Sequence, residues 1–341
     1  MSKVLSSNGV FALIDDLGNM SGGFEGLYAY DTRYVKFLKL SIQGIELFPW
    51  DLKEKSSSEV TLFLAGRGKG DVLLIRNISV ADGIYNDSVK LFNSSDEELR
   101  VRLTYEFLPA FEDIFEVRGA IKELERRRLD VIKGGENRLE LSYEGIDKST
   151  RTLKVNFTGR PRVRGYKLTY KVRLSPASSY QFKVSFSLHL IFGEKDERRE
   201  LLPVREAYGP LQDMGLRANP VYEAVFSRSM RDVAALTYTT RYGPVLLGGI
   251  PSFACIFGRD SIISALFILP FLPDYAKGTL RLLSAFQGKE YVPEREEEPG
   301  KILHELRLSE LTWAGMLPFS LYYGSIDSTP LYLILAYEYY R

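Results

Sequence analysis

The spacing of apolar residues changes once along this 341-residue chain, and the change constrains the fold more than any other sequence feature. Up to about residue 195, apolar and polar residues alternate, most completely in residues 100–107 and 180–190. This period of two predicts strands with one buried and one solvated face. After Asn219-Pro220, apolar residues recur at steps of three and four, which is the spacing of amphipathic helices. The sequence therefore predicts a β-rich half followed by a helical half.

Residues 1–195 are expected to form an antiparallel β-sandwich. Turn sequences such as Asn8-Gly9 and Asp82-Gly83 separate the alternating segments. Shorter alternating runs predict further strands at residues 10–14, 34–42, 60–64, 72–78, 138–143, 152–157 and 167–172. The first segment in which a helix is expected is the charged stretch at residues 122–128.

Residues 219–341 are expected to form an all-α domain without strands. A charged, proline-containing segment at residues 196–218 is predicted to link it to the sandwich and to contain at most a short helix. Helices are predicted at residues 222–236, 261–271, 274–287, 307–322 and 329–341.

The composition excludes several classes of function. Forty-five Lys and Arg residues balance 44 Asp and Glu residues, so neither nucleic acid nor an anionic membrane is expected as a partner. Cys255 is alone, and His189 and His304 lie far apart, so we expect no disulfide, no metal and no cofactor. The sequence starts without a signal peptide and has no apolar run long enough to cross a bilayer, which predicts a cytoplasmic protein.

Three polar clusters in the helical half are candidate functional sites. The first, at residues 256–262, contains Arg259 and Asp260. Asp260 or Ser261 could simply cap the following helix. A planar guanidinium beside a carboxylate can also bind the vicinal hydroxyls of a sugar, because it offers donors next to acceptors.

The second cluster, at residues 294–305, is a charge run that ends in the turn Pro299-Gly300. It suits a solvated loop, but Lys301, His304 and Glu305 lie within one turn's reach and could bind a polyol.

The third cluster, at residues 323–330, precedes the last helix. Pro330 suits the first turn of that helix, with Ser328 or Thr329 as its cap. Asp327 either supports this cap or points into a cavity.

In this order, the three clusters resemble the start of the catalytic domain in the archaeal and bacterial glycogen-debranching, or amylo-α-1,6-glucosidase, family. The family shows Gly-Ile-Pro-Trp-Phe…Phe-Gly-Arg-Asp-Ser, then Asp-Glu-Glu-Pro-Gly-Lys-Ile-X-His-Glu, then Tyr-Gly-Ser-Val-Asp-Ala-Thr-Pro-Leu. The matching stretches here are residues 249–261, 296–305 and 323–331, with Ser252 in place of the Trp. Residues 26–33 and 113–119 resemble the family's amino-terminal β-domain.

The resemblance implies a β-sandwich followed by an (α/α)6 barrel of twelve helices, of which about five are present, so an incomplete barrel is expected. It implies hydrolysis of α-glucosidic bonds by a two-carboxylate inverting mechanism. The general acid and base are expected on later loops beyond Arg341, so no catalytic residue is assigned. By their match to the family, we expect these residues to bind the sugar or line its pocket: Arg259, Asp260, Glu298, Lys301, His304, Glu305 and Asp327.

Two functional hypotheses follow. The favoured one is a debranching-type glycoside hydrolase acting on an α-glucan such as glycogen or limit dextrin, in a truncated or split form whose barrel a second polypeptide completes. The alternative is a non-catalytic α-glucan-binding or scaffold protein. The choice between α-1,6 and α-1,4 bonds and the role of the β-domain are left open.

Overall fold

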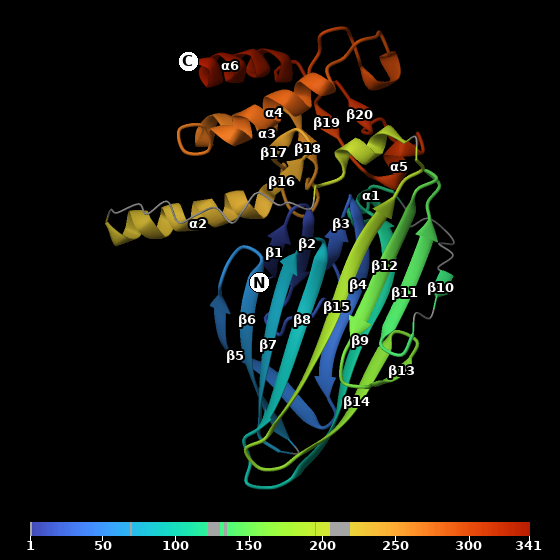
Figure 1. The fold of residues 1–341 in the computed structure, drawn as a ribbon, viewed down its shortest axis with the longest axis vertical. Coiled ribbons are helices and arrows are strands. Elements are labelled where there is room, and N and C mark those ends of the chain that lie inside the picture. The colour runs from blue at the N-terminus through green and yellow to red at the C-terminus, as the bar shows by residue number, and fades with distance from the viewer. Residues whose placement is uncertain (1, 69, 122–129, 133–134, 195, 205–218) are drawn as a thin grey trace.

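The computed structural model of this chain describes residues 2–68, 70–121, 130–132, 135–194, 196–204 and 219–341. A long β-rich body carries the helical half at one end (Figure 1). The helix expected at residues 122–128 lies outside the described residues, and residues 205–218 of the expected linker do too. The described part of that linker contains a short 3-10 helix, η1 (Glu197–Leu201). One helical turn, α1 (Ile114–Val117), precedes the position at which the first helix was expected.

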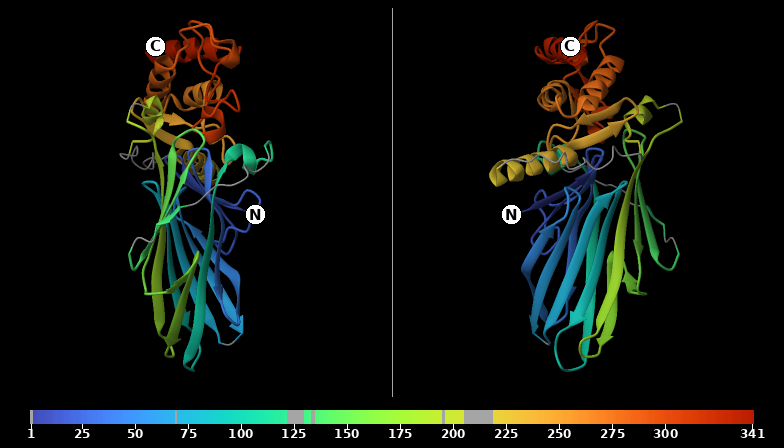
Figure 2. Two further views of the ribbon diagram at one scale, coloured as in Figure 1. Left: turned by 90° about the vertical axis from the view of Figure 1, so that its right-hand side faces the viewer. Right: turned by 60° about the vertical axis from the view of Figure 1, so that its left-hand side comes forward.

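Fifteen strands in the described residues form one continuous antiparallel sheet that folds over on itself. They are β1 (Lys3–Ser7), β2 (Val10–Ile14), β3 (Gly26–Ala29), β4 (Thr32–Ile42), β5 (Ile45–Glu54), β6 (Glu59–Gly68), β7 (Val72–Ala81), β8 (Ile84–Asn93), β9 (Leu99–Asp113), β10 (Asp130–Ile132), β11 (Arg138–Glu144), β12 (Thr150–Phe157), β13 (Arg162–Arg164), β14 (Lys167–Leu174) and β15 (Ser179–Ile191). One layer has the order β1-β2-β3-β4-β9-β14-β13, and the other has β5-β6-β7-β8-β15-β12-β11-β10. Figure 2 shows the two layers from the side. The predicted antiparallel β-sandwich is confirmed.

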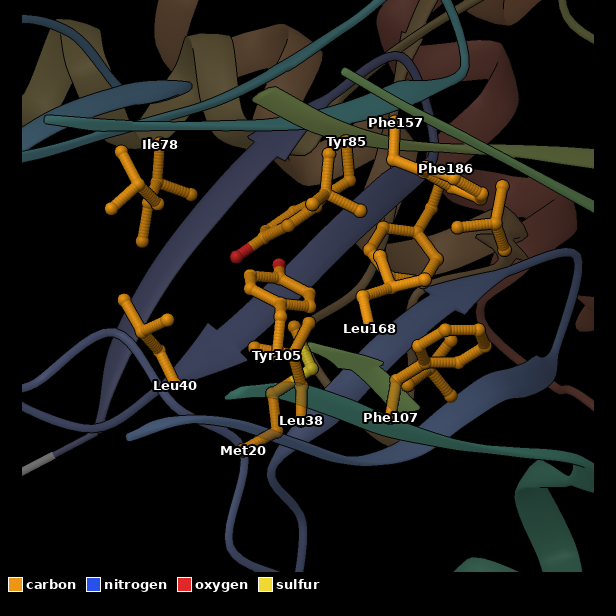
Figure 3. Packing of buried hydrophobic residues seen from close by; sticks show 14 of the residues in the cluster. Met20, Leu38, Leu40, Ile78, Tyr85, Tyr105, Phe107, Phe157, Leu168 and Phe186 are labelled. Carbon is orange, nitrogen blue, oxygen red and sulfur yellow. The ribbon is translucent and has the colours of Figure 1, made fainter. Parts of the chain in front are cut away.

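The core lies between the two layers, as the alternation in the sequence predicts. Tyr105 and Phe107 of β9 are buried, and both pack against Phe186 of β15 (Figure 3). Tyr105 also contacts Phe182 of β15. The ring centroids of Phe107 and Phe186 lie 5.2 Å apart. Burying each such side chain stabilises the fold by roughly 1.5–3 kcal/mol, so the sandwich is a rigid support for the loops at its end.

The alternation does not predict strands β8 and β5, and the structure shows why in each case. In β8, Asp87 occupies a buried position because it pairs with Arg76 of β7, with Nη2 and Oδ2 2.5 Å apart. A buried charge at a core position interrupts the apolar pattern. In β5, Pro49 and the exposed Trp50 leave no clear period.

The helical half combines helices with short strands. Its elements are α2 (Pro220–Leu236), β16 (Thr237–Thr240), β17 (Gly243–Leu246), β18 (Ile256–Phe257), α3 (Gly258–Ile268), α4 (Pro273–Ala285), η2 (Pro293–Arg295), β19 (Glu305–Leu306), α5 (Glu310–Trp313), β20 (Leu321–Tyr322) and α6 (Ser328–Tyr340). Strands β16 and β17 pair with each other, and β18, β19 and β20 form a second small sheet. The helices predicted near α2, α3, α4 and α6 are therefore present, whereas the expectation of an all-α domain without strands is wrong.

The helix predicted over residues 307–322 is also wrong. The structure has only the single turn α5 there, followed by β20. Ser309 caps α5, and Gly315 adopts a φ of 76° just after it, which a helix cannot continue. Arg307 and Glu310, whose spacing suits a helix, form bonds to the β half instead.

Helices α3, α4 and α6 pack around a shared core that includes Ile262, Leu283 and Leu335. By contrast α2 has no buried residue, and its Val221 and Tyr222 are 68% and 70% exposed. Four longer helices and the single turn α5 are present among the described residues of this half, fewer than the twelve helices of a complete barrel, which agrees with the predicted incomplete barrel. In the described part of the chain, no helix is both long and apolar enough to cross a membrane.

Candidate functional site

Arg259 and Asp260 lie in the first turn of α3, directly after the short strand β18. Phe257 is the N-cap, and its side chain makes no capping bond. Ser261 points inward, and its hydroxyl donates to the carbonyl oxygen of Leu246 at 2.7 Å. The helix begins before Asp260 and Ser261, so the interpretation of either as its cap is wrong. Asp260 instead carries its charge where the positive end of the helix dipole favours a carboxylate.

The Arg259 guanidinium lies between two carboxylates from different helices. Its Nη1 is 3.3 Å from Oδ2 of Asp327, the N-cap of α6, and its Nε is 3.7 Å from Oδ2 of Asp260. The Ser325 hydroxyl donates to Asp327 at 2.6 Å and, together with Arg259, lowers the pKa of Asp327. The three charged side chains are 38–47% exposed, so a ligand can reach them. We call Arg259, Asp260 and Asp327 the arginine–aspartate cluster.

Close backbone packing holds the starts of α3 and α6 together. A Cβ on Gly258 would lie 2.0 Å from the carbonyl oxygen of Leu303 and 2.9 Å from the hydroxyl of Ser328. The Thr329 hydroxyl accepts a hydrogen bond from the Ile302 N–H at 3.0 Å. Glycine is therefore required at position 258, because a side chain would collide with the Leu303 backbone and crowd Ser328 at the start of α6.

Glu298 and Lys301 form a separate ion pair in the loop before β19. The Lys301 Nζ lies 3.0 Å from Oε1 of Glu298 and donates to the carbonyl oxygen of Glu296 at 3.0 Å. Among the described residues, the ion pairs of Arg259 are with the two aspartates rather than with this loop. The structure therefore does not join Glu298 or Lys301 directly to the arginine–aspartate cluster.

His304 and Glu305 lie beside the start of α3 because β19 pairs with β18. The His304 ring makes edge-to-face contacts with Phe257 and Tyr322, at centroid distances of 5.7 and 5.9 Å. Glu305 is 7% exposed and pairs with Arg307. Burial raises the pKa of Glu305, and the neighbouring Arg307 opposes this shift. Glu305 thus faces the β half, whereas the arginine–aspartate cluster is open to solvent.

Arg307 is the centre of a buried ionic contact between the two halves. Its Nη1 lies 2.8 Å from Oδ1 of Asp31, and the Leu308 N–H donates to the other oxygen of Asp31 at 2.8 Å. Arg307 is 1% exposed and also pairs with Glu305. One guanidinium therefore links carboxylates from both halves of the chain.

Asp113 ties α1 to the helical half. Its Oδ1 accepts from the Phe115 N–H at 3.0 Å, and its N–H donates to Glu116, which completes a capping box for α1. Its Oδ2 accepts from the Ser309 hydroxyl at 2.6 Å. Burial raises the pKa of Asp113 to about 6, although the bond from Ser309 opposes this. Figure 1 shows α1 and α5 next to each other at this contact.

Glu310 makes a third contact between the halves. Its Oε1 accepts from the Tyr143 hydroxyl at 2.7 Å and from the Ile146 N–H at 2.9 Å. Sequence reasoning missed this role and those of Arg307, Asp31 and Asp113. A signal was available, because Asp31 and Asp113 lie in the two β-domain motifs at residues 26–33 and 113–119.

A closed series of seven planar side chains lies at the junction between the halves. Neighbouring members lie 4.8–6.1 Å apart, measured between ring centroids or from the guanidinium carbon to a ring centroid. We call this set the junction ring: Phe115, Arg118, Phe253, Phe257, His304, Tyr322 and Phe319. The Arg307 guanidinium lies 5.1 Å from the Phe115 centroid and 5.9 Å from the Phe257 centroid. The junction ring therefore combines two members from the β half with five from the helical half.

A cavity between the halves has a volume of about 30 Å³ and is lined by Tyr30, Asp31 and Cys255 among others. A small-molecule pocket is typically about 300–1,000 Å³, so this cavity has no room for a sugar. Within the described residues, no three His, Cys, Asp or Glu side chains are grouped so that they could hold a metal ion.

Two solved structures share this architecture over almost the whole chain. One, described as a kojibiose phosphorylase from the human microbiome, has a TM-score of 0.55 and 10% identity, and the match covers 98% of this chain and 53% of that one. The other, a bacterial glucoamylase complexed with acarbose, has a TM-score of 0.50 and 13% identity, with 99% and 55% covered. The chain thus spans about half the length of both. At these identities the likeness shows the fold alone, a β-domain followed by part of an (α/α)6 barrel.

The sequence itself matches a family. Among curated proteins, no sequence matches significantly. A family model described as the N-terminal domain of some glycogen debranching enzymes matches residues 5–185, which is more than half of the chain and nearly the whole sandwich. This protein therefore belongs to the family that carries the N-terminal domain of glycogen debranching enzymes.

Proposed function

We propose that this protein acts as a glycoside hydrolase of the glycogen-debranching, amylo-α-1,6-glucosidase-like type on α-glucans such as glycogen or limit dextrin. Its arginine–aspartate cluster holds the terminal glucose. The observation that supports this most directly is the position of the Arg259 guanidinium, 3.3 Å from Asp327 and 3.7 Å from Asp260, with all three side chains open to solvent.

The chemistry of the cluster suits a hexose. Arg259 offers N–H donors in a fixed plane, and Asp260 and Asp327 offer acceptors on either side of it. Vicinal sugar hydroxyls both donate and accept, so neighbouring hydroxyls can bind a carboxylate and the guanidinium together. Each hydrogen bond to a charged group contributes roughly 1.5–3 kcal/mol, or about tenfold or more in affinity.

The proposed reaction is inverting hydrolysis. A carboxylic acid protonates the leaving glycosidic oxygen while a carboxylate activates water on the opposite face, and the two groups stand roughly 6.5–9.5 Å apart to leave room for that water. No residue of this chain is assigned as the acid or the base. The described residues hold and orient the sugar, and His304 and Glu305 support this part of the site from the segment that bonds to β18 and to the start of α3.

The proposal divides the chain into a sandwich at residues 1–195, a linker at 196–218 and a barrel portion at 219–341. Further helices complete the barrel, in the same or a second polypeptide. The exposed apolar residues of α2 and the coverage of about half of the two solved structures support this completion. The proposed location is the cytoplasm.

The test combines activity with binding. The chain is prepared alone and together with the product of the adjoining downstream coding sequence, and release of glucose from limit dextrin is measured. Glucose binding by the chain is measured by NMR titration for wild type, Arg259→Ala and Asp327→Asn. The control is Arg228→Ala, which breaks another solvent-exposed pair, between Arg228 and Asp232 on α2.

We expect glucose release from the combined preparation and at least a tenfold loss of affinity in the two cluster variants only. Neither release nor binding in any preparation would overturn the proposal. Binding that depends on Arg259 without release from either preparation would favour the alternative, a non-catalytic α-glucan-binding protein.

A further inference from the structure

Arg118 and Phe253 form an exposed stack across the junction between the two halves. The guanidinium carbon of Arg118 lies 4.8 Å from the centroid of the Phe253 ring. Phe253 is 46% exposed, and Arg118 is exposed as well. Arg118 lies over one face of the Phe253 ring, and the exposed remainder of this aromatic side chain is open to a ligand.

The backbone on each side of the stack is tied down by hydrogen bonds, although its two members come from different halves. Arg118 directly follows α1, whose capping residue Asp113 bonds to Ser309 of the helical half at 2.6 Å. Phe253 lies in a tight backbone hairpin in which its N–H donates to the Gly249 carbonyl at 2.7 Å. A surface held on both sides in this way loses little conformational entropy when it binds a ligand.

The stack is also continuous with the arginine–aspartate cluster. The Phe253 ring lies 6.1 Å from Phe257, measured between centroids, and Phe257 is the N-cap residue of the helix that carries Arg259 and Asp260. Phe257 therefore connects the stack to the start of the helix that carries two members of the cluster.

The chemistry of the stack matches a pyranose. A sugar ring has an apolar C–H face and hydroxyls around its edge. The Phe253 ring offers a flat apolar surface, and the edge of the Arg118 guanidinium offers N–H donors to hydroxyls. An aromatic plane beside fixed hydrogen-bond donors is the kind of lining that small-molecule sites use.

We propose that Phe253 and Arg118 form a second sugar subsite, which binds a glucose unit next to the one held by the arginine–aspartate cluster. The β half thereby takes part in substrate selection, because it supplies Arg118. This inference rests on the proposed function, since it assumes that the bound chain is an α-glucan.

The test compares ligands that differ only in length. Isothermal titration calorimetry measures the affinity of the full chain for glucose and for maltotriose in wild type, Phe253→Ala, Arg118→Ala and Phe253→Trp. The matched control is Arg67→Ala, because Arg67 stacks in the same way on Phe48 of β5, with 5.5 Å between guanidinium carbon and ring centroid.

We expect wild type to bind maltotriose more tightly than glucose. Phe253→Ala and Arg118→Ala should each lower the maltotriose affinity about fivefold to tenfold and leave the glucose affinity unchanged. Phe253→Trp should retain the preference, because it keeps a flat ring, and Arg67→Ala should match wild type.

Equal maltotriose affinities in wild type, Phe253→Ala and Arg118→Ala would overturn the inference and leave the proposed function standing, provided that glucose still binds through Arg259. A parallel loss of glucose and maltotriose affinity in Phe253→Ala and Arg118→Ala would also overturn it, because it would indicate a structural effect on the whole site. Failure of wild type to bind either sugar would overturn the inference, and it would overturn the proposed function as well if no preparation released glucose from limit dextrin.

Discussion

Replacing Arg307 by Met should destabilise the contact between the two halves strongly. Arg307 is fully shielded from solvent, and it pairs with Asp31 and Glu305, whose side chains are 5% and 9% exposed. Methionine fills much of the volume but leaves two buried carboxylates facing each other without a cation. Removing one partner of a buried ion pair costs about 3–5 kcal/mol, and we expect a loss in free energy of unfolding within this range at pH 7.5.

The pH dependence of this loss gives a second readout. Burial already raises the pKa of Glu305, and Arg307 limits the rise, so Arg307→Met should raise this pKa further. A carboxyl group whose folded pKa lies above its unfolded value contributes stability that is lost as pH rises through the folded pKa. The deficit of the variant should therefore be larger at pH 7.5 than at pH 5.

The assay is urea denaturation followed by tryptophan fluorescence at both pH values. Arg241→Met is the matched control, because Arg241 pairs with Glu200 at 2.6 Å but is 56% exposed, and it should cost at most about 1 kcal/mol. Arg307→Met combined with Glu305→Gln should recover part of the loss. Equal losses for the Arg307 and Arg241 variants, or a deficit independent of pH, would refute the reasoning.

Three further predictions concern packing, hydrogen bonding and protonation. Burial holds the pKa of the Asp113 carboxyl at about 6 against a usual 3.8, so wild type should lose about 3 kcal/mol of stability as pH rises from about 4 to 6. Asp113→Asn cannot ionise and should not show this loss. If the free energy of unfolding changed equally with pH in wild type and variant across that window, the reasoning would be contradicted. Gly258→Ala should cost about 1–3 kcal/mol or more, because its Cβ would meet a carbonyl oxygen at 2.0 Å, whereas Gly249→Ala, with open space around it, should change the melting temperature little. Tyr143→Phe removes a 2.7 Å bond to a buried carboxylate and should cost about 1.5–3 kcal/mol in urea denaturation, clearly more than Tyr180→Phe, whose hydroxyl bonds to a carbonyl oxygen near the surface.

Much of the sandwich could be predicted, because one face of each long strand is buried. In β9 and β15 the buried residues are the ones that the alternation indicates, including Tyr105 and Phe186. The prediction failed where burial involves charge, as in β8, whose Asp87 is hidden only because Arg76 of the neighbouring strand neutralises it. A pattern of hydrophobicity cannot reveal such a pair, because the two residues meet only in the folded sheet.

For the candidate site, local sequence and tertiary contacts contributed differently. The motif around Arg259 and Asp260 indicated a helix start with polar groups, and that helix start is present. Its contact with Asp327, which lies 68 residues further along the chain, depends on the packing of α3 against α6. The helix predicted over residues 307–322 failed for a related reason, since Arg307 and Glu310 bond to the β half rather than to water.

The sequence alone determined where the spacing of apolar residues changes from that of strands to that of helices, and hence which half forms the large sheet. It also determined the family, because the family model matches the sequence of the strand segments over residues 5–185. Only the tertiary structure decided which charged groups are buried at the junction, among them Asp31 and Arg307, and which remain open, among them Arg259. The physical reason is that the free energy of a charge depends on its distance from other charges and from water, and both distances are set by elements far apart in sequence.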